Sequence, residues 1–150
     1  MTDVPVIRRA IAADLPACAA IMNAYIDATD WLPRLIPVED IEDMFSPELL
    51  ERRLVLVPEV EGKVAGYLSL DVQAQFLHAL YLAPEYRTRG LGKALLNSAK
   101  AVCSTGFELT VWQPNIRAKQ FYLREGLRQI GLGADEAGLP VFRMKWAGQS

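Results

Sequence analysis

The sequence predicts a single mixed α/β domain, and three observations support this. The 150 residues fit one domain of ordinary size, and 51% of them are hydrophobic, enough for a full core. Short β-branched segments alternate with segments whose apolar residues recur at helical spacing. No internal repeat or low-complexity linker divides the chain, so we expect residues 1–150 to form one domain. The predicted order is β-α-α-β-β-β-α-β-α-β-β, which is typical of a layered fold.

The N-terminal part of the chain predicts one strand followed by helices. Residues 4–9 are short and rich in β-branched side chains, as strands are. Asp14 stands where an N-cap is expected, directly before a stretch, 15–28, with apolar side chains at helical spacing. Two prolines end that helix in a loop. After the loop, a short acidic helix is expected at 38–45, and a further helical turn opens at Ser46-Pro47.

The middle of the chain predicts three consecutive strands. They are expected at 54–60, 63–72 and 76–82, and the first two are joined by a turn at Glu61-Gly62. The third strand ends before Pro84, because proline has no N–H to offer to a neighbouring strand.

The last third of the chain predicts two helices and three strands. Gly106 and Gly126 are expected to end the helices. The first of these helices should bury Leu91, Ala94, Leu95, Ala99 and Val102. The expected elements are a helix at 90–104, a strand at 107–112, a helix at 115–125 and strands at 127–130 and 139–146, with a loop at 131–138.

The charge and cysteine content exclude several classes of protein. A net charge of −2 gives no global basic field, so we expect no nucleic-acid partner. The segment 86–128 is mainly basic and the segment 27–51 mainly acidic, which favours an anionic ligand at one and a cationic ligand at the other. The chain shows neither a signal-peptide pattern nor an apolar run long enough to span a membrane. Cys18 and Cys103 lack metal-type spacing, so we expect reduced thiols in a cytoplasmic protein, with one disulfide as the alternative.

The stretch YRTRGLGKAL, residues 86–95, combines glycines and basic side chains where a strand gives way to a helix. The first amides of a helix have no partner within it, and the helix dipole adds positive charge there. Gly90 and Gly92 allow a ligand to approach the backbone closely, and Arg87, Arg89 and Lys93 add full charges. This combination suits a diphosphate.

Three simpler interpretations of this stretch are a Walker loop, a dinucleotide fingerprint and an ordinary helix N-terminus. A Walker loop requires a Ser or Thr after the lysine, where Ala94 stands, so that interpretation fails. A dinucleotide fingerprint requires a third glycine, where Leu95 stands, so that match is weak. The remaining alternative is an ordinary helix N-terminus with solvated arginines.

A longer segment, FLHALYLAPEYRTRGLGKALL at 76–96, resembles the coenzyme A-binding core of the GCN5-related N-acetyltransferase superfamily. The family signature [Q/R]-x-x-G-x-[G/A] is matched by Arg87, Gly90 and Gly92. A second family element, N-x-x-A-x-x-F-Y-x-x-x-G, follows at 115–126 in the expected order. The one departure is Leu127, where the family usually has an aromatic residue. The resemblance implies the acyl-CoA N-acyltransferase fold, a central, mostly antiparallel mixed sheet flanked by helices.

The resemblance also implies acetyl-CoA as the cosubstrate, with no metal. The backbone of the signature loop would bind the diphosphate, the preceding strand would pair with the pantetheine arm, and an N–H near Leu80 would polarise the thioester carbonyl. Asn115 would hydrogen-bond the arm, or serve only as an N-cap. The implied cofactor-binding residues are Leu80, Tyr81, Leu82, Arg87, Thr88, Arg89, Gly90, Leu91, Gly92, Lys93 and Asn115.

Two residues are candidates for proton transfer. The resemblance makes Tyr122 the acid that protonates the departing sulfur; core packing beside Phe121 is its alternative role. His78 is the only histidine, and its ordinary pKa of about 6.5 suits a general base. It lies two residues before Leu80, so we expect both side chains on one face of the strand. The segment HALYL resembles the arylalkylamine N-acetyltransferases, in which a histidine here helps to deprotonate the amine. A half-buried structural histidine is the alternative.

The acceptor is expected to be a primary amine, and a small molecule is favoured because no peptide-recognition motif is present. Tyr25 and Trp31, with Phe45, are candidates for an aromatic slot, and acidic residues at 27–40 would attract a cation. The function predicted is therefore acetyl transfer from acetyl-CoA to a small-molecule amine. The alternatives are a protein N-terminal or lysine acetyltransferase and a non-catalytic acyl-CoA-binding domain. The sequence leaves a homodimer open and indicates neither a membrane nor a nucleic-acid partner.

Overall fold

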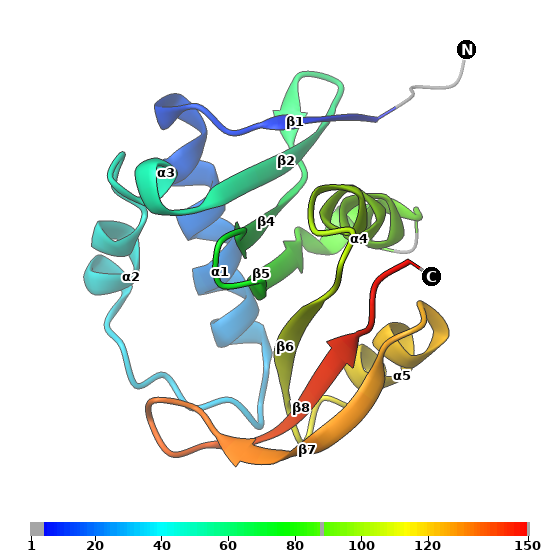
Figure 1. The fold of residues 1–150 in the computed structure, drawn as a ribbon. Helices are drawn as coiled ribbons and strands as arrows, with labels where there is room; N and C mark the ends of the chain where they lie inside the picture. Colours follow the sequence, from blue (N-terminus) through cyan, green and yellow to red (C-terminus); the bar gives the residue numbers. More distant parts are fainter. Residues whose placement is uncertain (1–4, 88, 150) are drawn as a thin grey trace.

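A mixed β-sheet forms the centre of the molecule (Figure 1). The computed structural model describes residues 5–87 and 89–149. Eight strands lie within those ranges: β1 (Val6–Arg9), β2 (Leu54–Val60), β3 (Lys63–Val64), β4 (Gly66–Asp71), β5 (Phe76–Leu82), β6 (Phe107–Trp112), β7 (Arg128–Ala134) and β8 (Pro140–Trp146). Their order in the sheet is β1-β2-β4-β5-β6-β8-β7, with β3 paired to β2 beside that path. Only β5 and β6, among the strands described, pair in parallel.

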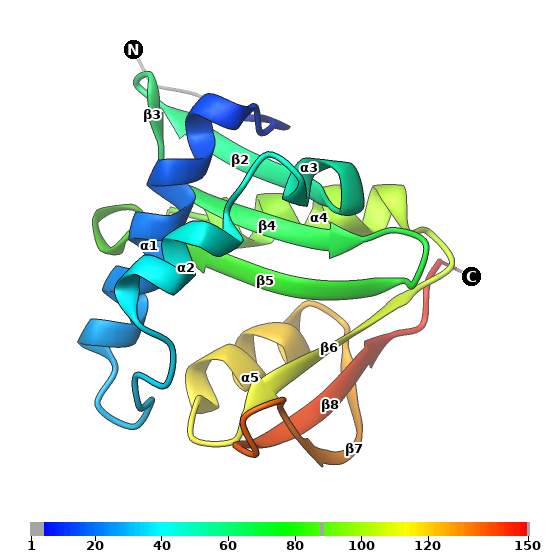
Figure 2. The ribbon, with the colours of Figure 1, turned by 90° about the vertical axis from the view of Figure 1, so that its left-hand side faces the viewer.

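Helices cover both faces of this sheet (Figure 1, Figure 2). One face carries α1 (Leu15–Ala28), α2 (Val38–Met44) and α3 (Leu49–Arg52). The other carries α4 (Leu91–Val102) and α5 (Ile116–Arg124). Short 3-10 helices at Ala12–Asp14 and Pro84–Tyr86 lead into α1 and towards α4.

Each face of the sheet has its own hydrophobic core. Leu68 and Leu95 belong to a core between the sheet and α4 and α5, together with Phe107 and Met144. Tyr67, next to Leu68 in β4, belongs instead to a core beneath α1 and α3. This alternation follows from the two-residue period of a strand. Because helices cover both faces, β2 and β4 are buried almost throughout.

The predicted fold class is confirmed, and most predicted elements lie within one or two residues of their observed positions. The predicted strand at 63–72 is divided at Ala65 into β3 and β4. Val102 was expected to be buried, but it is 47% exposed near the end of α4. Cys18 and Cys103 are free and buried, so the disulfide alternative is wrong. No helix in the described ranges is both long and apolar enough to cross a membrane.

The last hairpin is longer than the sequence predicted. β7 continues through Gly131 and Gly133 to Ala134, although their glycine content had indicated a loop. Strand pairing with β8 overrides that local signal. The connection is reduced to 135–139, where the Asp135 carboxylate accepts hydrogen bonds from the N–H groups of Ala137 and Leu139.

Asp14 does not cap α1 with its side chain, as the sequence had predicted. Its carboxylate instead pairs with the Arg8 guanidinium at 2.7 Å and accepts the N–H of Ile11. The hydrogen bonds from Arg8 hold the pKa of Asp14 below its usual value. Asp14 therefore joins β1 to the start of α1, a tertiary role that a local capping rule does not reveal.

Gly66 in β4 is expected to be intolerant of any side chain. A Cβ there would lie 2.4 Å from the carbonyl oxygen of Tyr81 in the neighbouring strand. We predict that Gly66→Ala lowers the free energy of unfolding by about 1–3 kcal/mol through overpacking, measured by urea denaturation. Gly133→Ala is the matched control, because a Cβ at that strand position meets its nearest atoms at an ordinary 3.6 Å. Equal stability of the two variants would contradict the prediction.

Candidate active site

The parallel strands β5 and β6 meet at one end and separate along their length (Figure 2). Their only register pair is Phe76 with Glu108, whose N–H donates to the carbonyl of Gln75. Beyond this pair the two strands diverge, and a gap opens in the sheet beside the second half of β5. The gap leaves one edge of β5 without a neighbouring strand.

The free edge of β5 carries the backbone groups of Leu80 and Leu82. Ala83 donates its N–H to Ala65, towards β4. Successive residues of a strand direct their N–H groups to alternate edges, so those of Leu82 and Leu80 are directed to the gap. Backbone donors at such an edge require a partner, and an extended chain of amides can supply one.

The N-terminus of α4 lies at the end of β5. Gly90 precedes the helix with a φ of 77°, a left-handed conformation that suits glycine. The first helical hydrogen bond runs from the N–H of Ala94 to the carbonyl of Gly90, so the amides of residues 91–93 have no partner in the helix. A Cβ on Gly92 would lie 3.6 Å from Phe121 and 3.8 Å from Leu82, which places this glycine where α4, α5 and β5 meet.

Basic side chains surround these free amides. Arg87, Arg89 and Lys93 are exposed, and the Arg89 guanidinium lies over the Tyr86 ring at 5.3 Å. No ion pair among the described residues engages the three. Thr88, which the sequence analysis included, lies outside the described residues. Free amides and unpaired cations together suit a diphosphate group.

Asn115 connects α5 to α1 across the gap. Its side-chain oxygen accepts the N–H of Ala118, which makes it the N-cap of α5. Its amide nitrogen donates to the hydroxyl of Tyr25 at 3.0 Å, and the Tyr25 ring lies 4.9 Å from that of Tyr81. A side-chain amide has two N–H groups, so Asn115 keeps one donor for a ligand.

Tyr122 is buried in α5, in the core between this helix and the sheet. Burial, with the neighbouring Tyr25, raises the pKa of Tyr122. Burial likewise raises the pKa of Tyr81 and of Tyr25. All three phenols therefore remain protonated at neutral pH, and Tyr122 can act as a proton donor.

His78 occupies a β-bulge in β5. Ser69 in β4 pairs with Ala79, but the next residue, Leu70, pairs with Leu77, so His78 has no partner in the register. The extra residue changes which side chains share a face. Leu77 and Leu80, three residues apart, both pack in the core of α4 and α5.

The bulge corrects the prediction that His78 and Leu80 share a face. The His78 ring lies 4.7 Å from that of Phe76 and interacts electrostatically with Arg53, Asp71 and Glu136. Arg53 reaches the hydroxyl of Ser69, which belongs to the face covered by α1–α3. His78 therefore points to that face, whereas Leu80 points to the other.

The environment of His78 favours the neutral imidazole, although the residue is partly exposed to solvent. Burial and the nearby Arg53 cation lower the pKa of His78 below 6.5. The ring is therefore a free base at neutral pH and is able to accept a proton. Neither Arg53 nor Glu136 was singled out from the sequence, because no local pattern relates them to His78.

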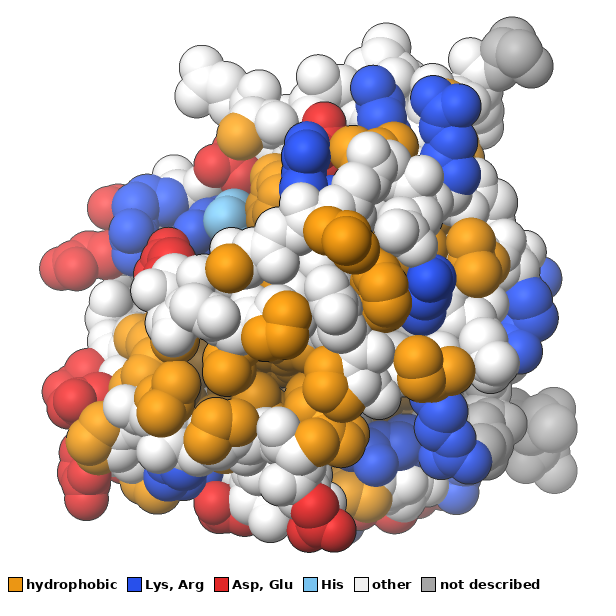
Figure 3. Space-filling view, turned by 90° about the horizontal axis from the view of Figure 1, so that it is seen from below, with side chains coloured by type: hydrophobic (Ala, Val, Ile, Leu, Met, Phe, Trp, Pro, Cys, Tyr) orange, Lys and Arg blue, Asp and Glu red, His pale blue; other side chains and the backbone are white. Residues whose placement is uncertain are grey.

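A hydrophobic hollow lies next to the β7–β8 turn (Figure 3). Its volume is about 110 Å³, and its walls come from α1, the 32–36 loop, α2, β6 and the turn. The predicted aromatic slot is not formed as one group: Trp31 packs 6.0 Å from Trp112, Tyr25 packs on Tyr81, and Phe45 packs on Tyr67. Asp27, one of the acidic candidates, pairs with Arg34.

Comparison with known proteins agrees with this arrangement. Residues 30–147 match the family described as "Acetyltransferase (GNAT) domain". The peptidyl-lysine N-acetyltransferase YiaC of Escherichia coli is 30% identical over 144 residues, which cover 93% of this chain and 95% of YiaC.

Two solved structures share the fold. The apo form of YjaB from Escherichia coli has a TM-score of 0.78 at 24% identity and covers 97% of this chain and 99% of its own. The acetyltransferase yncA of Salmonella typhimurium, solved with acetyl-CoA, has a TM-score of 0.73 at 21% identity and covers 98% and 95%. With the family match across most of its length, the chain belongs to the GNAT superfamily and is an acetyl-CoA-dependent N-acetyltransferase.

Proposed function

We propose that this protein transfers an acetyl group from acetyl-CoA to the ε-amine of a lysine in a peptide or protein. The observation that carries the proposal is the gap between β5 and β6, bordered by the free amides at the start of α4. From the sequence alone, a small-molecule amine is the first expectation for the acceptor. The similarity to a peptidyl-lysine acetyltransferase along nearly the whole chain favours lysine instead.

The arrangement suits the diphosphate and the pantetheine arm of acetyl-CoA. The amides of residues 91–93, with Arg87, Arg89 and Lys93, would bind the diphosphate. The free edge of β5 at Leu80 and Leu82 would pair with the amide-rich arm, as an added strand does. Asn115 would donate its remaining N–H to the same arm.

The side chains on either side of the gap suit direct attack of an amine on a thioester. Acetyl-CoA supplies the acetyl group in activated form. A lysine amine has an ordinary pKa near 10.4, so it must lose a proton before its nitrogen can form the new bond to carbon. His78 would accept that proton, directly or through a water molecule, and the N–H of Leu80 would polarise the carbonyl. Tyr122 would donate its proton to the sulfur as the carbon–sulfur bond breaks.

The hydrophobic hollow suits the stem of the acceptor. A lysine side chain carries four methylene groups beneath its amine, and such stems lie well against apolar surfaces. Ile26, Ile41 and Trp112 line the hollow, and Ala137 and Asp135 at its edge adjoin Glu136, which acts on His78. The hollow therefore lies on the same face of the sheet as the proposed base.

The function is tested with an N-terminally blocked peptide that contains one lysine. We expect mass spectrometry to find the acetyl group on the lysine ε-nitrogen, and Tyr122→Phe to lower kcat by about 10²-fold. A matched peptide with a free α-amine and no lysine serves as the comparison. Acetylation of that peptide alone would contradict the lysine assignment, and an unchanged rate in Tyr122→Phe would return Tyr122 to a packing role.

The diphosphate site is tested with a carboxylate placed at the start of α4. Gly92→Glu brings bulk and negative charge to the free amides, so we expect at least a tenfold weaker affinity for CoA by calorimetry. Asn97→Glu adds the same charge to an exposed position later in the same helix and should leave the affinity unchanged. Wild-type affinity in Gly92→Glu would place the diphosphate elsewhere.

The role of His78 predicts a particular pH profile. Because its pKa in the folded protein is lowered, the acid limb of kcat/KM should lie below pH 6.5, with full activity retained above it until other groups titrate. We expect His78→Ala to reduce kcat/KM and to remove this limb. If His78→Ala shows an acid limb at the same pH as the wild-type protein, another group is the base.

A further inference from the structure

Arg53 is a half-buried arginine without a carboxylate partner. It lies between α3 and β2. Three arginines in the described ranges are half-buried: Arg8, Arg34 and Arg53. Arg8 pairs with Asp14 at 2.7 Å, and Arg34 pairs with Asp27 at 2.9 Å. Within the part of the chain that the structure describes, the only side-chain hydrogen bond of Arg53 is a long one, from Nη1 to the hydroxyl of Ser69 at 3.4 Å.

The environment of Arg53 favours binding of an anion. Removing a guanidinium from water costs free energy unless a charged or hydrogen-bonding partner replaces the water. Burial lowers the pKa of Arg53, as expected for a guanidinium that has lost part of its hydration. Asp71 attracts it electrostatically but forms no ion pair with it, and one Asp71 oxygen accepts the N–H of Ala74 in the adjoining turn.

Arg53 lies close to the proposed base. Ser69, its hydrogen-bond partner, is paired across the sheet with Ala79, the residue next to His78. Arg53 is also the principal charge acting on the imidazole of His78. An anionic group bound at Arg53 would therefore lie near an amine that His78 deprotonates.

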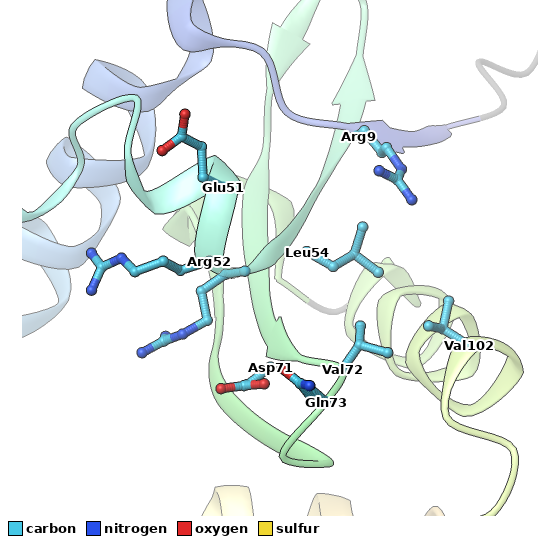
Figure 4. Close-up of a pocket in the computed structure, with 9 residues that line it drawn as sticks. Arg9, Glu51, Arg52, Leu54, Asp71, Val72, Gln73 and Val102 are labelled. Carbon is cyan, nitrogen blue, oxygen red and sulfur yellow. The ribbon is translucent and has the colours of Figure 1, made fainter.

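There is room for such a group beside Arg53. Arg53 borders an open basin of about 780 Å³ at the edge of the sheet, together with Arg52, Asp71 and Gln73 (Figure 4). Figure 4 shows Arg52 and Glu51 to one side of β2, and Leu54, Val72 and Val102 to the other. The space-filling view shows Lys or Arg side chains next to the chain's single histidine (Figure 3).

We infer that Arg53 binds a carboxylate of the acetyl acceptor. Arginine is suited to this because its planar fork matches a carboxylate in geometry and charge. Glu136, which acts on His78 from the β7–β8 turn, supplies the opposite charge for the ammonium group. This inference rests on the proposed function and adds to it a preference for acceptors that carry both charges. The carboxylate has two possible sources: an Asp or Glu beside the target lysine, or the carboxylate of a free amino acid.

The experiment compares matched acceptors that differ only in this charge. One arm uses blocked lysine peptides with Glu or Gln at the flanking positions. The other arm uses free lysine and its carboxamide. We expect the wild-type protein to favour the carboxylate member of at least one pair by roughly tenfold in kcat/KM, the effect of one charged hydrogen bond. The arm that shows the preference identifies the source.

Variants of two arginines locate the effect. Arg53→Gln should abolish the preference, and Arg53→Lys, which retains the charge, should keep part of it. Arg124→Gln removes an equal charge from an exposed position at the end of α5, outside the basin, and should keep the whole preference. Thermal denaturation confirms that each variant is folded.

The outcomes separate this inference from the function on which it rests. If amines are acetylated but the wild-type protein does not distinguish Glu from Gln or acid from amide, the inference is wrong and the proposed function stands. A preference that survives in Arg53→Gln also overturns it. If the protein binds CoA but acetylates neither the peptides nor the amino acids, the proposed function fails as well.

Discussion

The separation of β5 from β6 after a single pair of residues is the constraint on which the rest of the site depends. A sheet normally satisfies its backbone groups by continuing the ladder, and here the ladder ends at Phe76 and Glu108. The free edge of β5 borders the resulting gap, and α4, with its free amides, begins at the end of that strand. Each group alone is ordinary, and the proposed function depends on their meeting at one opening.

Contacts between distant segments hold this opening in place. Asn115 joins α5 to Tyr25 of α1, and Tyr25 packs on Tyr81 of β5, so one short chain of contacts spans the gap. The bulge in β5 serves a different purpose. It turns His78 to the face covered by α1–α3 while leaving Leu80 packed on the opposite face. The proposed base therefore lies on one face of this strand, and Leu80 on the other.

Local sequence signals were enough to predict most of the fold. Prolines, helix-ending glycines and apolar periodicity act within a few residues, and they placed α1, α4, β6 and α5 nearly correctly. The family motif indicated the residues around Gly90 for the same reason, because its glycines and basic residues are contiguous. The predictions were wrong where contacts between distant segments determine the structure. β7 is extended by its pairing with β8, and Asp14 is drawn to Arg8 rather than to the helix end.

In the candidate site, too, local signals are insufficient where contacts between distant segments determine the geometry. A bulge depends on how two strands align, so the side to which His78 points was not available from its spacing to Leu80. Arg53 follows another arginine and precedes a hydrophobic strand, and nothing local distinguishes it from Arg52. Only the packing around them shows that Arg53 is half-buried whereas Arg52 is exposed.

Because β5 and β6 are paired at only one position in the described residues, the sheet consists of two parts. Strands β1 to β5 form one part and β6 to β8 the other, and helices rather than a continuous ladder join them. An extended amide chain lying in the opening would act as a missing strand for one part and a tie to the other. The resistance of this protein to heat then becomes a joint property of polypeptide and cosubstrate, rising with the concentration of the latter by mass action.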